Sequence, residues 1–285
     1  MISKEMTPRG LTSRRLTNIL ASILSAASAL VGLIFLTWIL FVVLSKGASS
    51  LSLAFFTKLP TPPGMEGGGL ANAIVGSVIM TFLGTMVGVP LGLCTGVFLA
   101  EFGRGSWLSD LVRFSANMLM GMPSIIIGVF VYGLMVTTMG GFSGLAGAMS
   151  LAILILPIVA KTTDDILHLV PNALREAGLA LGIPRWRVVN SIIFRAARTG
   201  LLTGVLLAVA RVSGETAPLL FTALNSPYWP DSLSKPMANL TVTIFNYAMS
   251  PYENWQQMAW GASFLILLSV LGLTLVSRVI LGSKK

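Results

Sequence analysis

The sequence predicts an all-α protein that crosses a membrane six times. Of its 285 residues, 54% are hydrophobic and only 10% are charged, and the mean hydropathy is +0.85. A soluble domain carries about 25% charged residues, so this composition indicates a membrane protein. Long uncharged runs, separated by short basic segments, give the positions of the spans.

The uncharged runs define the spans in order. About 20 apolar residues are needed for a helix to cross a bilayer. Residues 16–45, 67–100 and 254–277 hold one span each, and the run at 114–160 is long enough for two, divided near Gly140. A further span is expected between about Thr199 and Phe221. The first run is too long to be the apolar core of a signal peptide.

The expected segments of the chain follow from these runs. A tail at 1–15 precedes the first span at 16–45, and an outer loop covers 46–69. A five-helix domain covers 70–280, includes a cytoplasmic segment at 161–190, and is followed by a short tail at 281–285.

Charge placement orients the chain. With the N-terminus inside, 15 of the 19 Lys and Arg residues lie in inner segments, Arg211 lies within a span, and three lie in outer loops (Lys46, Lys58 and Lys235). Positive residues concentrate on the cytoplasmic side of membrane proteins, so both termini are expected in the cytoplasm. The net charge of +9 therefore reflects topology. No nucleic-acid binding is predicted, because the basic residues are not gathered on one soluble domain.

The second span carries two stripes of small residues. One stripe consists of glycines at four-residue spacing, and the other of small and hydroxyl residues beside it: Gly84, Gly88, Gly92 and Gly96; Ala73, Ser77, Thr81 and Thr85. A glycine stripe lets another helix backbone approach closely. Ordinary close packing is the favoured interpretation, and a moving helix beside a pathway is the alternative. Pro90 is expected to bend this helix.

Between Val170 and Val189 the sequence predicts a bent, basic hairpin of two short helices. Leu174, Ala177 and Leu181 give the first helix an apolar face, and Gly182 stands where a left-handed cap would end it. Pro184 then precedes Arg185-Trp186-Arg187, an aromatic residue between two cations. A simple amphipathic loop on the membrane surface is the alternative interpretation.

Arg211 and Glu215 are charged residues inside a predicted span. Arg211 lies 13 residues beyond Arg198, which is about 20 Å along a helix. A charge at the bilayer centre costs about 2.5–3.5 kcal/mol, and ionisable groups there are usually functional. The spacing of four would let the two side chains pair on one helix face. They therefore form either part of a substrate pathway, with Ser213 and Thr216 as further donors, or a structural ion pair.

Several chemistries lack their residues in this chain. Cys94 is the only cysteine and His168 the only histidine, so a multi-cysteine or histidine metal cluster is not expected. The chain has no G-x4-G-K-[ST] loop to hold ATP phosphates. The sequence therefore predicts no cofactor and no catalytic residues.

The basic hairpin resembles a motif of the permeases of ATP-binding-cassette (ABC) importers. Glu176-Ala177-Gly178, Gly182 and Ile192 follow the family pattern E-A-A-x3-G-x9-I-x-L-P. The sequence departs from this pattern at Gly178 and, in the closing Leu-Pro, at Phe194 and Arg195. The resemblance implies a type I importer (MetI-like) architecture over 70–280. It also implies that Glu176, Ala177, Gly178, Gly182, Arg185 and Trp186 dock on a separate ATPase.

Three further segments resemble the phosphate-importing branch of that family. They are Gly68–Gly76, Ala210–Leu224 and Trp255–Trp260, in order along most of the chain. The resemblance implies a subunit of the bacterial plasma membrane that moves inorganic phosphate inward. It also implies a second permease subunit, an ATPase dimer and an external phosphate-binding protein as partners.

Three alternatives stay open from the sequence. The first is an ABC permease for another oxyanion, such as sulfate or molybdate. The second is an ion-coupled carrier, although the paired halves typical of such carriers are not found here. The third is an added role in signalling phosphate status.

Overall fold

The computed structural model describes residues 8–65 and 67–282, with side chains placed for residues 14–65 and 67–276. The described residues form helices joined by loops and contain no strand. The elements are α1 (Pro8–Ser50), α2 (Leu53–Thr57), α3 (Ala71–Val97), η1 (Phe98–Phe102), α4 (Trp107–Gly121), α5 (Ser124–Val131), η2 (Tyr132–Val136), α6 (Thr137–Met139), α7 (Gly144–His168), α8 (Asn172–Ala180), α9 (Arg185–Val188), η3 (Val189–Ile193), α10 (Phe194–Val212), α11 (Ala217–Thr222), α12 (Leu240–Ala248) and α13 (Glu253–Gly282).

The all-α, six-span prediction agrees with these helices. Five are long and apolar enough to cross a membrane, and a sixth span results if the bent pair formed by α4 and the helix from Ser124 to Met139 counts as one. The chain bends by 103° between the two halves of that pair. Met122, which precedes Pro123, is extended (φ −73°, ψ 140°). A residue before proline is driven out of the helical region, which explains the break at this point.

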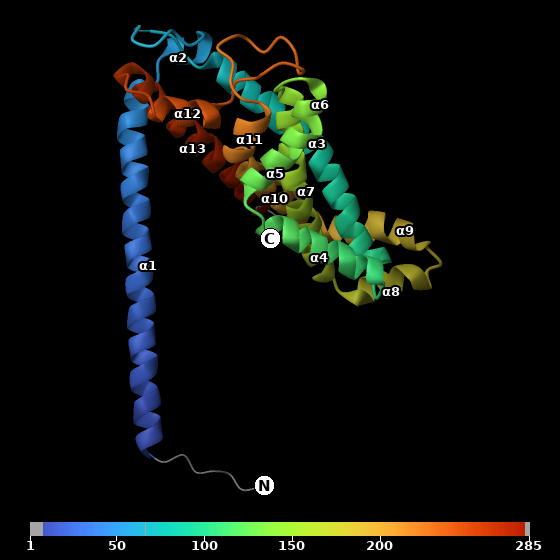
Figure 1. Ribbon diagram of the computed structural model, residues 1–285. Helices are drawn as coiled ribbons and strands as arrows, with labels where there is room; N and C mark the ends of the chain where they lie inside the picture. The colour runs from blue at the N-terminus through green and yellow to red at the C-terminus, as the bar shows by residue number, and fades with distance from the viewer. Residues whose placement is uncertain (1–7, 66, 283–285) are drawn as a thin grey trace.

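The first helix stands apart from the rest of the molecule (Figure 1). Its described side chains from Arg14 to Ile39 are exposed. Contact with the body is made near its C-terminal end, where Gly47 lies against Trp260 and Phe264 of α13. The Lys46 ammonium lies 5.2 Å from the centre of the Trp260 ring. An apolar helix exposed along most of its length requires lipid or another protein around it.

The core of the body is the contact between α3 and α7, which run side by side (Figure 1). Met80, Leu151, Ile155 and Val159 are almost fully buried there, together with side chains of α10 and α11. A second cluster lies at the end of the body that carries α8 and α9, where Leu167, Val188 and Ile193 pack together. The first cluster joins the middle parts of α3 and α7, and the second joins the end of α7 to the hairpin side of the fold.

The helices of the fourth and fifth predicted spans differ in extent from the uncharged runs. The run that holds the fourth span ends at residue 160, whereas its helix, α7, continues to His168. Lys161 and Asp165 form an ion pair of 2.6 Å at positions i and i+4, which supports these last turns.

The fifth span starts earlier than Thr199 and ends before Phe221. A continuous helix of α9, η3 and α10 runs from Arg185 to Val212, so the predicted second short helix continues without a break into the helix of this span. The helix breaks at residues 213–216, and α11 begins with Pro218 in its first turn. Proline fits a first turn because its missing N–H would have no partner within the helix there. The predicted helix through Phe221 is therefore wrong.

Candidate functional site

The basic hairpin, residues 170–189, turns at Gly182. Gly182 has φ +73°, its N–H donates to Leu179 O at 2.9 Å, and the N–H of Ile183 donates to Gly178 O at 3.3 Å. These two bonds define a Schellman cap, which satisfies carbonyls that a helix end leaves free. The predicted left-handed stop at Gly182 is confirmed.

The outward face of the hairpin is apolar. Leu174, Ala177, Leu181 and Trp186 are exposed, with Leu181 at 79% and Trp186 at 59% of their full accessible surface. The Arg187 guanidinium lies 5.2 Å from the Trp186 ring. Glu176 is also exposed. Grouped apolar side chains at the tip of a protein typically form an interaction surface.

Packing on the inward face of the hairpin explains why Gly178 stands at the third position of the E-A-A motif. Gly178 is buried against α9 and η3, and a Cβ at this position would lie 2.9 Å from Val188 Cγ2 and 3.0 Å from Ile192 Cδ1. An alanine here would push the two sides of the hairpin apart. Arg175, three residues earlier, points to the same inner side and is buried.

The Arg175 side chain holds Glu101, a residue that sequence reasoning missed. Glu101 lies in η1, at the end of α3, and is only 2% exposed. Arg175 Nη2 donates to Glu101 Oε1 at 2.6 Å, and Nε donates to the same oxygen at 3.0 Å. Arg185 Nη2 donates to the backbone oxygen of Glu101, and its guanidinium lies 5.5 Å from the Phe102 ring. The available signal was that Glu101 is the first charge after the uncharged run at 67–100.

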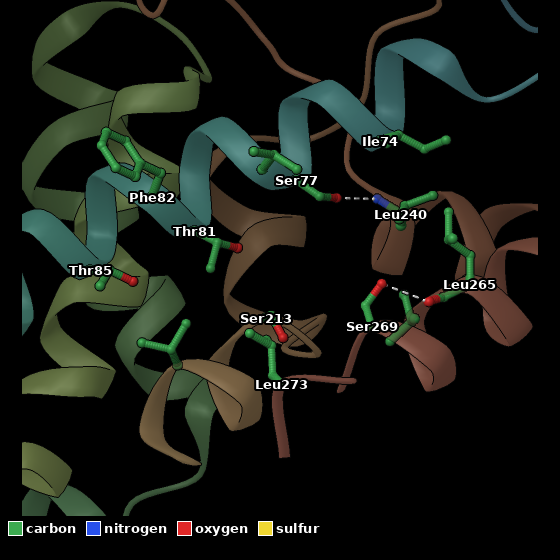
Figure 2. Close-up of a pocket in the computed structure, with 13 residues that line it drawn as sticks. Ile74, Ser77, Thr81, Phe82, Thr85, Ser213, Leu240, Leu265, Ser269 and Leu273 are labelled. Atoms are coloured by element: carbon green, nitrogen blue, oxygen red, sulfur yellow. Dashed lines mark hydrogen bonds between the residues drawn. The ribbon is translucent and has the colours of Figure 1, made fainter. Parts of the chain in front are cut away.

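A cavity of about 410 Å³ lies between α3, α10, α12 and α13. Its wall is mainly apolar, with five hydroxyl side chains: Ser77, Thr81, Thr85, Ser213 and Ser269. Figure 2 shows the first three along one side of α3, facing the space that Ser213 and Ser269 border. We call this space the hydroxyl-lined cavity.

Two hydroxyls in this wall differ in their hydrogen bonding. The Ser77 hydroxyl accepts from the N–H of Leu240, the first residue of α12, at 2.8 Å. The Thr85 hydroxyl is buried and has no hydrogen-bond partner among the described residues. Buried polar groups nearly always form hydrogen bonds, so the unpaired Thr85 hydroxyl is free to form one inside the helical body of the protein.

The four stripe glycines are all buried against α7. Their Cβ positions would lie 3.0, 2.8, 2.9 and 2.6 Å from the backbone oxygens of Ala148, Ala152, Leu156 and Ala160, in the order Gly84, Gly88, Gly92 and Gly96. Because any side chain larger than hydrogen would collide with backbone, the stripe sets how closely α3 and α7 approach. The neighbouring hydroxyl stripe faces the cavity.

Arg211 and Glu215 do not pair within the chain. No ion pair in the part of the chain that the structure describes joins them, because α10 ends at Val212 and the two residues do not share a continuous helix face. Arg211 is exposed and Glu215 is half-buried. The pair that the spacing allowed is therefore not formed within the chain, and a structural ion pair in the assembled protein stays a prediction.

The predicted pathway residues are divided between two surfaces. Val209 and Ser213 line the hydroxyl-lined cavity, whereas Arg211 lies two residues from each, on the opposite face of α10. Thr216 caps the start of α11, and its backbone oxygen accepts from the N–H of Leu219 at 3.1 Å. The backbone oxygen of Glu215 accepts from the Thr241 hydroxyl at 2.8 Å.

Comparisons with known proteins agree with this architecture. Residues 88–282 match the family described as "Binding-protein-dependent transport system inner membrane component". The chain is 50% identical to the phosphate transport system permease protein PstA of Yersinia pestis over 95% of this chain and 92% of that protein. It is also 50% identical to PstA of Haemophilus influenzae, over 92% and 93%.

Solved structures show the same fold. A chain of the MetNI methionine ABC transporter, in an inward-facing conformation, superposes with a TM-score of 0.62 over 75% of this chain and 95% of that chain. The two are 20% identical, so this likeness concerns the fold alone.

Proposed function

Because this chain belongs to the family of binding-protein-dependent inner-membrane permeases, in its PstA phosphate branch, we propose that it forms half of a channel that imports inorganic phosphate. The partners are a PstC-like second permease, a PstB-like ATPase dimer and a PstS-like phosphate-binding protein, as the sequence resemblance implies. In this arrangement the chain is a multi-pass protein of the bacterial plasma membrane with both termini in the cytoplasm.

The hairpin supplies the surface for the ATPase. The chain carries no phosphate-binding loop for ATP, so the energy for transport comes from a separate subunit. The exposed Leu174, Leu181 and Trp186 would enter a groove of that subunit, and Gly182 fixes the angle between the two arms. Fifteen inner basic residues against three outer ones support placing this hairpin in the cytoplasm.

The exposure of Arg211 is the observation that carries the proposal. Arg211 lies about 20 Å along the helix from Arg198, and its guanidinium has no carboxylate partner in the described part of the chain. Placing such a charge against lipid costs free energy, so this face of α10 borders a second protein chain or a water-filled passage. Arginine suits phosphate because its planar fork donates to two oxygens at once. A passage between the two permeases, with Arg211 at its wall, would keep the charge away from lipid and would bring it into contact with phosphate.

Replacement of Arg211 tests this role. In complexes with all partners, Arg211→Gln should assemble normally but lose about 10- to 100-fold of phosphate uptake, since a hydrogen bond to a charged group contributes about 1.5–3 kcal/mol. Arg211→Lys should retain part of the uptake, because it keeps the charge without the fork. The double change Arg211→Gln with Glu215→Gln should stay as inactive as the single change.

The readout is phosphate uptake into vesicles, measured beside the yield of the complex. Recovery of uptake in the double variant would make Arg211 a structural partner of Glu215 in the assembled complex. Competing sulfate and molybdate test the substrate. Uptake that either anion blocks more strongly than phosphate itself would assign the permease to another oxyanion.

A further inference from the structure

Both helices of the basic hairpin bind Glu101, a residue at the end of α3. Arg175 of α8 binds the Glu101 carboxylate, and Arg185 of α9 binds the Glu101 backbone oxygen. The side chain of Glu101 is 2% exposed and that of Arg175 is 11% exposed. Among the ion pairs of the described residues, this pair is the most deeply buried. A buried charge is costly without its partner, so separation of this pair is strongly opposed.

The α3 terminus is capped by arginines at three consecutive carbonyls. Leu99 O accepts from Arg113 Nη2 at 3.1 Å, Ala100 O accepts from Arg104 Nε at 2.6 Å, and Glu101 O accepts from Arg185. Helix ends leave such carbonyls without partners, and cations at a C-terminus also oppose the negative end of the helix dipole. Only Arg185 among the three comes from the hairpin.

Arg175 also connects the hairpin to the end of α7. Its Nη2 donates to Leu167 O at 2.7 Å and its Nη1 to Val170 O at 2.6 Å. One guanidinium therefore joins α8, the last turn of α7 and Glu101 at the end of α3. The planar guanidinium is held in one orientation by its several hydrogen bonds. A lysine ammonium at the same place would not be held in this way.

The helix held in this way reaches the hydroxyl-lined cavity. Thr81 lies 20 residues before Glu101, about 30 Å along the helix. Between them α3 is packed on α7 through the glycine stripe, where the two backbones are too close together to admit a Cβ atom. Tightly packed helices move together, so a displacement at Glu101 is transmitted to the cavity wall.

We propose that Glu101 and Arg175 are positioning residues that convert movement of the basic hairpin into movement of α3 and α7 at the hydroxyl-lined cavity. The inference rests on the proposed function, because it takes the ATPase as the source of the hairpin movement. Loss of the pair leaves ATP hydrolysis running while less phosphate is moved for each ATP consumed.

The test compares the ratio of phosphate transported to ATP hydrolysed in vesicles that contain the complete importer. Glu101→Gln and Arg175→Lys should lower this ratio by about 2- to 30-fold, the range expected for changes within a coupling network. The matched control is Asp165→Asn, which removes the exposed ion pair with Lys161 on α7 and should leave the ratio unchanged. The ratio does not depend on how much complex survives purification.

A second measurement reports the movement itself. In a Cys94→Ala background, a cysteine replacing Thr81 should change its reactivity toward a thiol reagent when ATP is added. In combination with Glu101→Gln, this ATP-dependent change should disappear although ATP is still hydrolysed.

The outcomes separate the two proposals. If the unmodified importer hydrolyses ATP but moves no phosphate, the proposed function fails. If it moves phosphate and both variants keep the normal ratio, or Thr81→Cys responds to ATP in the Glu101→Gln protein as before, the positioning role is refuted. A lower yield with an unchanged ratio would make the pair merely structural and would also refute it.

Discussion

Replacement of Gly182 by valine tests whether the angle of the basic hairpin matters. Gly182 has φ +73°, and no atom lies within 4 Å of the position where its Cβ would stand. A substitution there meets no neighbour, so its effect is conformational and not steric. Valine strongly disfavours the left-handed region, whereas asparagine adopts it more readily than other non-glycine residues. Gly182→Asn is therefore the matched control.

The magnitude follows from two ways in which the chain can respond. If the backbone keeps φ +73°, the left-handed conformation costs valine about 1–2 kcal/mol. If the backbone relaxes, the two cap hydrogen bonds from Gly182 and Ile183 are lost, at about 0.5–1.5 kcal/mol each. Either response costs roughly 2 kcal/mol, which shifts the equilibrium toward a misplaced hairpin by about 30-fold.

The assay is phosphate-stimulated ATP hydrolysis in reconstituted complexes, together with the amount of ATPase that co-purifies with the permease. Gly182→Val should insert in the membrane at normal levels but lose ATPase association or stimulated hydrolysis, because Arg185 and Trp186 are displaced. Gly182→Asn should keep most of both activities. Normal stimulation and association in Gly182→Val would refute the argument that the left-handed cap positions the docking surface.

Two further predictions concern packing and topology. Gly96→Ala should lower the melting temperature of the purified complex relative to Gly32→Ala, because the added methyl collides with α7 at the first site and meets no atom at the second; equal melting would show that the stripe is not tightly packed. Alanine favours a helix over glycine by about 1 kcal/mol at both sites, and overpacking costs about 1–3 kcal/mol at Gly96 alone. In a Cys94→Ala background, Ser234→Cys should react with an impermeant thiol reagent from outside and Ala173→Cys only after permeabilisation. Reaction of both from one side would contradict the proposed orientation.

The sequence alone determined the features that depend on local chemistry. Uncharged runs long enough to cross a bilayer gave the membrane class and the number of spans. The stop at Gly182 followed from the glycine between two helical patterns, and its φ of +73° agrees. The glycine stripe on the second span was visible because residues four apart share a helix face. These features are fixed by the covalent chain over a few turns of helix.

Only the tertiary structure decided that α10 ends at Val212 and which charges meet. The spacing of Arg211 and Glu215 suggested a pair, but α10 ends between them, where Thr241 binds the Glu215 backbone oxygen from a helix 26 residues away. Thr81 and Thr85 were recognised only as part of a small stripe, and their cavity needs walls from α10, α12 and α13. Such contacts join segments far apart in sequence, and no local pattern specifies them.

The Glu101–Arg175 pair is the clearest example of a contact that no local sequence pattern predicts. The two residues are 74 positions apart, and neither belongs to a spacing that predicts the other. Their meeting depends on the length of α3, on the continuation of α7 to His168 and on the turn into α8. The sequence therefore determined that this is a membrane protein with a bent basic hairpin, while the packing of α3 on α7 decided which buried ion pair holds that hairpin in place.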